Sequence, residues 1–133
     1  MTSETFARRH RILVVEDDPA VAALLSDFLT GEGHEVDTAL NGRLALEQLR
    51  AAPYDLIVSD MRMPDLDGEG FFAAFDEVRP GMRSRIIFVT GQALTAETRE
   101  FIARAQVPIL GKPFDLDVLR EKAEELLAAR SSH

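Results

Sequence analysis

A chain of 133 residues, 46% of them hydrophobic, has the length and composition of one compact globular domain. The absence of cysteine excludes disulfides and thiolate metal sites, and the net charge of −8 argues against direct contact with nucleic acid, which requires a basic surface. The longest apolar runs, at 12–15 and 86–89, are far shorter than the roughly 20 residues that span a bilayer. No signal peptide is recognisable at 1–11, so we expect a cytoplasmic protein that contacts no membrane.

The first half of the chain alternates short apolar runs with segments of helical periodicity. Continuous β-branched and aliphatic residues at 12–15 predict a strand buried on both faces. Pro19 suits the first turn of a helix, and Gly31 and Gly33 are expected to end that helix. Further elements are expected as a weak strand at 35–38, a turn at Asn41-Gly42, a helix from Leu44 that Pro53 ends, and a strand at 56–58.

The second half repeats the alternation. A helix containing Phe71, Phe72, Phe75 and Val78 is expected to stop at Pro80-Gly81, before a strand at 86–89. Thr95 is the expected N-cap of a helix that carries Phe101 and Ile102, followed by a short strand at 107–110 and a final helix at 116–127.

This alternation predicts an α/β fold, with a parallel sheet covered by helices on both faces. We expect one domain at 11–127, with an N-terminal lead-in at 1–10 and a fraying C-terminal tail at 128–133. The three histidines, His10, His34 and His133, are scattered along the sequence and are expected to be exposed to solvent, without a role as ligand or base.

Polar residues follow the predicted strands at the points where the strands end. Glu16-Asp17-Asp18 follows the first strand, Asp60 the third, Thr90 the fourth and Lys112 the fifth. Ligands of open parallel sheets bind outside the carboxyl ends of the strands, so these carboxylates, hydroxyl and ammonium are expected to converge there.

The converging groups suit a metal-assisted phosphoryl site. Clustered carboxylates repel one another, at about 4 kcal/mol per pair for 4 Å and an effective dielectric constant near 20, and a hard cation such as Mg²⁺ removes that cost. Asp60 could then attack phosphorus to give an aspartyl phosphate. Lys112 would neutralise charge on the transferred group, and Thr90 would donate a hydrogen bond to a phosphoryl oxygen.

Each of these residues also has a plainer explanation. Asp18 could simply cap the following helix, Asp60 could be a turn residue, and Thr90 could end a strand. Lys112 alone would be a solvated surface group. The placement of all of them at strand ends, in order, favours a shared site.

Four segments resemble the response-regulator receiver domains of bacterial two-component systems: ILVVEDD at 12–18, VSDMRMPDLDG at 58–68, FVTG at 88–91 and GKPF at 111–114. The resemblance covers about 11–127. It implies a doubly wound, flavodoxin-like three-layer sandwich, with five parallel strands in the order 2-1-3-4-5.

The resemblance also implies a role for each matched residue. Asp60 would be the phosphoacceptor, and Asp17 and Asp60 would bind Mg²⁺ together with the backbone carbonyl of Arg62. Glu16 would contribute to the metal site partly through water. Thr90 would be the switch hydroxyl and Lys112 the phosphate-binding lysine, with a cis peptide bond between Lys112 and Pro113.

The family takes its phosphoryl group from a histidine kinase or phosphotransfer protein and catalyses only its own phosphorylation and dephosphorylation. We therefore expect a signalling domain and not an enzyme. Its output would pass to a downstream protein or a homodimer through the face built by the helix carrying Phe101, the strand at 107–110 and the final helix. The alternative is a pseudo-receiver that binds partners without phosphorylation.

The sequence departs in two ways from the pattern that many members show. Ile109 stands where many members have an aromatic residue that moves together with the switch threonine, so the usual coupling between the two is in doubt. Arg62 and Gln92, each two residues beyond a site residue, would alter access of the hydrolytic water.

Overall fold

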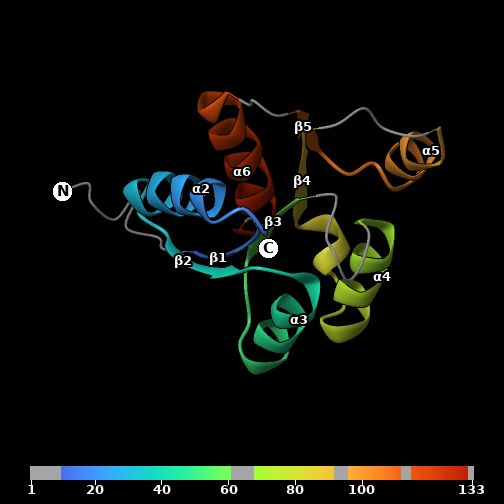
Figure 1. The fold of residues 1–133 in the computed structure, drawn as a ribbon, viewed down its shortest axis with the longest axis horizontal. Helices are drawn as coiled ribbons and strands as arrows, with labels where there is room; N and C mark the ends of the chain where they lie inside the picture. The colour runs from blue at the N-terminus through green and yellow to red at the C-terminus, as the bar shows by residue number, and fades with distance from the viewer. Residues whose placement is uncertain (1–9, 61–67, 92–95, 112–114, 132–133) are drawn as a thin grey trace.

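The sheet contains five parallel strands in the order β2-β1-β3-β4-β5, which confirms the predicted topology (Figure 1). This computed structural model describes residues 10–60, 68–91, 96–111 and 115–131. The strands are β1 (Arg11–Val15), β2 (Glu35–Ala39), β3 (Leu56–Asp60), β4 (Ile86–Thr90) and β5 (Ile109–Gly111).

Helices cover both faces of the sheet. They are α2 (Pro19–Gly31), α3 (Gly42–Ala51), α4 (Gly68–Val78), α5 (Ala96–Ala105) and α6 (Leu116–Ser131), with a 3₁₀ turn η1 (Met82–Ser84) before β4. One core cluster packs α2 and α6 on one face, and a second packs α3, α4, η1 and α5 on the other. Figure 1 shows α2 and α6 above the sheet and α3 and α4 below it.

Strand alternation divides the core between these two faces. In β1, Ile12 and Val14 belong to the cluster under α2 and α6, whereas Leu13 and Val15 belong to the cluster under α3 and α4. All four side chains are fully buried. Successive side chains of a strand point to opposite faces, so a strand covered on both sides must be apolar throughout, as the sequence indicated.

Local sequence sets where two of the helices begin. Asp18 is the N-cap of α2, and its side chain accepts a hydrogen bond from the Ala20 N–H at 2.9 Å, with Pro19 in the first turn. The predicted turn at Asn41-Gly42 is instead the start of α3, because the Asn41 side chain accepts from the Leu44 N–H at 2.8 Å. Gly33, with φ of 100°, carries the chain from α2 into β2.

Three further features differ from the expected ones. Strand β5 begins at Ile109 and not at Val107, because Pro108 has no N–H to continue the ladder, although its carbonyl accepts from the Phe88 N–H. Helix α6 continues to Ser131, past the expected end at 127. The η1 turn was not foreseen, and the expected N-cap Thr95 lies outside the described residues.

The expectation of scattered, exposed histidines was wrong for two of the three. His10 and His34 are half-buried, and their ring centroids lie 5.6 Å apart. The backbone N–H of Glu35 donates to the His10 carbonyl at 2.9 Å, which aligns the starts of β1 and β2 and brings the two rings together. His133 lies outside the described residues.

Candidate metal and phosphoryl site

Strand register places the acidic residues at one level of the sheet. β1 and β3 are neighbours, and Val15 pairs with Ser59, so the next residues along, Glu16 and Asp60, are level. On the other side of β3, Asp60 pairs with Val89, which puts Thr90 one step beyond it. These carboxyl ends of parallel strands meet at one edge, as the sequence predicted.

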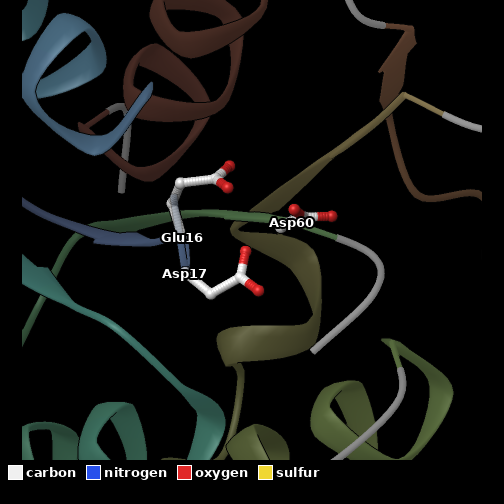
Figure 2. A group of neighbouring side chains, drawn as sticks. All are labelled: Glu16, Asp17 and Asp60. Atoms are coloured by element: carbon white, nitrogen blue, oxygen red, sulfur yellow. The ribbon is translucent and has the colours of Figure 1, made fainter. Parts of the chain in front are cut away.

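Three acidic side chains converge at this edge. Oxygens of Glu16, Asp17 and Asp60 all lie within 4.8 Å of one another. Figure 2 shows that the Glu16 and Asp17 side chains leave the end of β1 in different directions while Asp60 extends from β3 beside them. Glu16 is 1% exposed and Asp60 is 8% exposed, whereas Asp17 is exposed, so the group opens to solvent on the side of Asp17.

Backbone hydrogen bonds hold the loop that carries the acidic residues. The Glu16 N–H donates to the Ala39 carbonyl at 3.0 Å, which ties the loop to the end of β2. One carboxylate oxygen of Glu16 accepts from the Asp18 N–H at 3.2 Å. Asp18 itself caps α2 and is not a member of the three-carboxylate group. This agrees with the simpler interpretation of Asp18 as a helix cap.

Ser59 is a buried polar residue that sequence reasoning overlooked. It is fully buried in β3, and its Oγ donates to the Asp60 carbonyl at 3.0 Å. The buried polar or charged side chains among the described residues are Glu16, Ser59, Asp60 and Thr90. All four lie at or beside the carboxyl ends of β1, β3 and β4, and a serine interrupting an apolar run was the available signal for Ser59.

Of the remaining predicted residues, the structure describes Thr90 and Ile109. Thr90 ends β4, is 6% exposed and pairs with Gly111 of β5. Ile109 pairs with Phe88 and packs, half-buried, against the core under α4 and α5. Lys112, Pro113, Arg62 and Gln92 lie outside the described residues, and so does the expected cis peptide bond.

The donor set fits a hard divalent cation. Mg²⁺ prefers oxygen ligands and is commonly held by one or two carboxylates plus waters and phosphate oxygens. Three carboxylates within 4.8 Å, one of them exposed to solvent, supply that type of ligand. Glu16, Asp17 and Asp60 each offer one carboxylate oxygen to such an ion.

The fold and the site define a class of protein: doubly wound α/β domains with an acidic cluster at the carboxyl ends of the central strands. The family model of the response regulator receiver domain matches residues 12–124. The chain therefore belongs to the response-regulator receiver domain family.

In some similar proteins the matched region is nearly the whole protein, and in others it is only a part. The response regulator receiver protein CpdR of Brucella abortus is 34% identical over 119 residues, which cover 90% of this chain and 98% of CpdR. The transcriptional regulatory protein GlrR of Escherichia coli K12 is 34% identical over 116 residues. The chain covers 26% of GlrR and 42% of TcrA of Mycobacterium tuberculosis, so it spans less than half the length of these relatives.

Solved structures share the fold over nearly the whole chain. A CheY-like receiver from Methanospirillum hungatei is 30% identical with a TM-score of 0.85, covering 94% of this chain and 98% of that one. The receiver of the sensor histidine kinase PA1611 from Pseudomonas aeruginosa is 29% identical with a TM-score of 0.78, covering 91% of this chain and 99% of that one. That structure has a magnesium ion coordinated in its active-site cleft.

Among the helices described for this chain, none is long and apolar enough to cross a membrane.

Proposed function

We propose that Asp60 is the phosphoacceptor of this receiver and that its phosphorylation depends on Mg²⁺ held by Glu16, Asp17 and Asp60. The observation that carries the proposal is the convergence of these three carboxylates within 4.8 Å at the ends of β1 and β3. Asp60 extends from the central strand β3, so the sheet fixes its position. The magnesium-bound receiver of PA1611 supports the choice of metal.

The phosphodonor is a phosphohistidine of a histidine kinase or phosphotransfer protein. A carboxylate oxygen of Asp60 attacks phosphorus, the P–N bond breaks, and the released imidazole nitrogen keeps the bonding electron pair and later takes up a proton. A divalent cation held by Glu16, Asp17 and Asp60 would neutralise charge on the equatorial phosphoryl oxygens. Thr90 would donate its hydroxyl hydrogen to a phosphoryl oxygen, and the resemblance to receiver domains assigns the ammonium of Lys112 to another phosphoryl oxygen and the carbonyl of Arg62 to the metal.

The domain acts as a signalling phosphoacceptor. Water later cleaves the aspartyl phosphate, and the only chemistry assigned to the domain is its own phosphorylation and dephosphorylation. The phosphorylated state is read by a downstream protein or by a second copy through the face formed by α5, β5 and α6. Because relatives such as GlrR are named transcriptional regulatory proteins, control of transcription is one output that we propose for a receiver of this kind.

Intact-mass measurement after incubation with acetyl phosphate and Mg²⁺ tests the proposal. We expect one added phosphoryl group on the wild-type protein and on Asp18→Asn, which removes a nearby carboxylate that only caps α2. We expect none on Asp60→Asn. An unmodified wild-type mass, under conditions that modify another receiver, would instead support the pseudo-receiver alternative.

A further inference from the structure

Two histidines lie side by side at the amino ends of β1 and β2, on the edge of the sheet opposite the one that carries Asp60. Strand register pairs Arg11 with Glu35, so the residues just before them, His10 and His34, are level. The Glu35 N–H donates to the His10 carbonyl at 2.9 Å, and the two imidazole rings have centroids 5.6 Å apart. Both side chains are half-buried, so the pairing of the strands holds the two rings in a fixed relation.

The spacing of the rings suits two ligands of one metal ion. With a metal–nitrogen bond of about 2.0–2.1 Å, two imidazoles on one tetrahedral ion have centroids about 5 Å apart. The rings are tilted by 56° and are not stacked in parallel. Nδ1 of His34 is buried and makes no hydrogen bond with the described residues, so a metal ion would satisfy a nitrogen that the fold leaves unused. A metal-binding histidine uses one nitrogen for the ion, so His10 can bind while its other nitrogen has a protein partner.

The surroundings of the pair favour a bound cation. Burial, and then the neighbouring His10, lower the pKa of His34, so its imidazole is neutral near neutral pH and keeps a lone pair for a metal. Three carboxylates act on His34 in the opposite direction, because their negative charge favours a positive charge at this position. They are Glu32 at the end of α2, Glu124 on α6 and Asp55 before β3.

We propose that His10 and His34 bind a transition-metal ion of the Zn²⁺ type at the amino ends of β1 and β2. Imidazole suits Zn²⁺ and Cu²⁺, whereas Mg²⁺ prefers oxygen, so the two edges of the sheet select different ions. Among the described residues, three ligand residues within 4.8 Å of one another occur at the acidic group, so the histidine pair is a two-ligand site at which water fills the other positions. A bound ion would join the starts of the two strands.

Calorimetric titration of the untagged protein with Zn²⁺ tests the proposal, with excess Mg²⁺ present to compete for the acidic residues. We expect one Zn²⁺ per chain, and binding at least about tenfold weaker in His10→Gln and in His34→Gln, because each loses one of two protein ligands. Tyr54→Phe removes a hydrogen bond to Asp37 of β2 but keeps both imidazoles, so this control should bind Zn²⁺ normally. Asp60→Asn should also bind it normally, which makes the result independent of the phosphoacceptor assignment.

Electron paramagnetic resonance of bound Cu²⁺ identifies the ligands directly. The wild-type spectrum should show hyperfine splitting from two imidazole nitrogens, and each histidine variant should lose one of them, with circular dichroism used to confirm that the variants are folded. Zn²⁺ should also raise the Tm of the wild-type protein more than that of either variant. Unchanged Zn²⁺ affinity in both histidine variants, or a Cu²⁺ spectrum of oxygen ligands alone, would overturn the proposal.

Discussion

The backbone N–H of Asp18 donates a hydrogen bond to the carboxylate of Glu16 at 3.2 Å, so the buried acid shapes the loop that follows it. This contact gives Glu16 a structural role besides its negative charge. The two roles can be separated by substitution, because glutamine keeps an acceptor oxygen and removes the charge.

Glu16→Gln should stabilise the metal-free protein and weaken its binding of Mg²⁺. The variant removes repulsion among three carboxylates within 4.8 Å, and because Asp17 is exposed we expect a gain of only about 1 kcal/mol in the free energy of unfolding. Urea unfolding in the presence of a chelator measures the gain, and Mg²⁺ titration measures the affinity. Glu121→Gln, on the exposed surface of α6, is the control and should change neither. A destabilised Glu16→Gln protein would contradict this account of the acidic group.

Asp18→Ala should destabilise the fold without abolishing phosphorylation. The substitution removes the acceptor for the Ala20 N–H at the start of α2, a loss of about 1 kcal/mol for a helix N-cap. Asp18→Ser should recover most of that stability, because serine also caps helices. Thermal unfolding measures the change in stability, and intact mass after treatment with acetyl phosphate shows whether the variant is phosphorylated. Failure of Asp18→Ala to accept phosphate while still folded would place Asp18 in the reactive group.

His34 should make the protein less stable as the pH falls below about 6.5. Burial, and then the neighbouring His10, lower the pKa of His34 in the folded state, so the unfolded chain binds a proton more readily. The contribution of His34 is therefore complete above the unfolded pKa of about 6.5 and is lost as the pH falls through that value to the lower, folded one. Denaturant unfolding between about pH 5.5 and pH 7.5 should show this loss, and His34→Gln should reduce it. His133→Gln is the control, and an unchanged pH dependence in His34→Gln would contradict the assignment.

Tyr54 should ionise about two pH units above the ordinary value near 10. Burial and the hydrogen bond that its hydroxyl donates to Asp37 at 2.6 Å raise the pKa of Tyr54 to about 12. It is the single tyrosine of a chain without tryptophan, so ultraviolet absorbance reports it without interference. Since the folded pKa is the higher one, the stability that Tyr54 contributes is complete below pH 10 and is lost between about pH 10 and pH 12.

The Asp37→Asn variant tests the cause of that shift. Removing the charge from the hydrogen-bonded partner should move the Tyr54 titration toward 10, with circular dichroism used to confirm that the protein remains folded. Asp76→Asn, on α4, serves as the matched carboxylate control and should leave the titration of Tyr54 unchanged. A midpoint near 10 in the folded wild-type protein would contradict the buried hydrogen bond.

Apolar runs and the polar residues after them are local signals, and they were sufficient to predict a parallel α/β sheet and the convergence of Glu16, Asp17 and Asp60. The strand order was predicted only through the resemblance to receiver domains. The sequence was not sufficient for features that depend on contacts between distant segments. The rings of His10 and His34 meet only because β1 and β2 pair, and the rings of Phe72 and Phe101 meet only when α4 and α5 pack on β4. The start of β5 was misplaced because Val107 is buried like a strand residue although the ladder begins after Pro108.

Chemical trapping of the phosphoryl group tests the central claim most directly. Borohydride reduces an aspartyl phosphate to homoserine, so the protein can be phosphorylated with acetyl phosphate and Mg²⁺, reduced, digested and sequenced by tandem mass spectrometry. We predict homoserine at residue 60 alone, and none when Mg²⁺ is replaced by a chelator. Homoserine at Asp17 or Asp18 with none at Asp60 would contradict it.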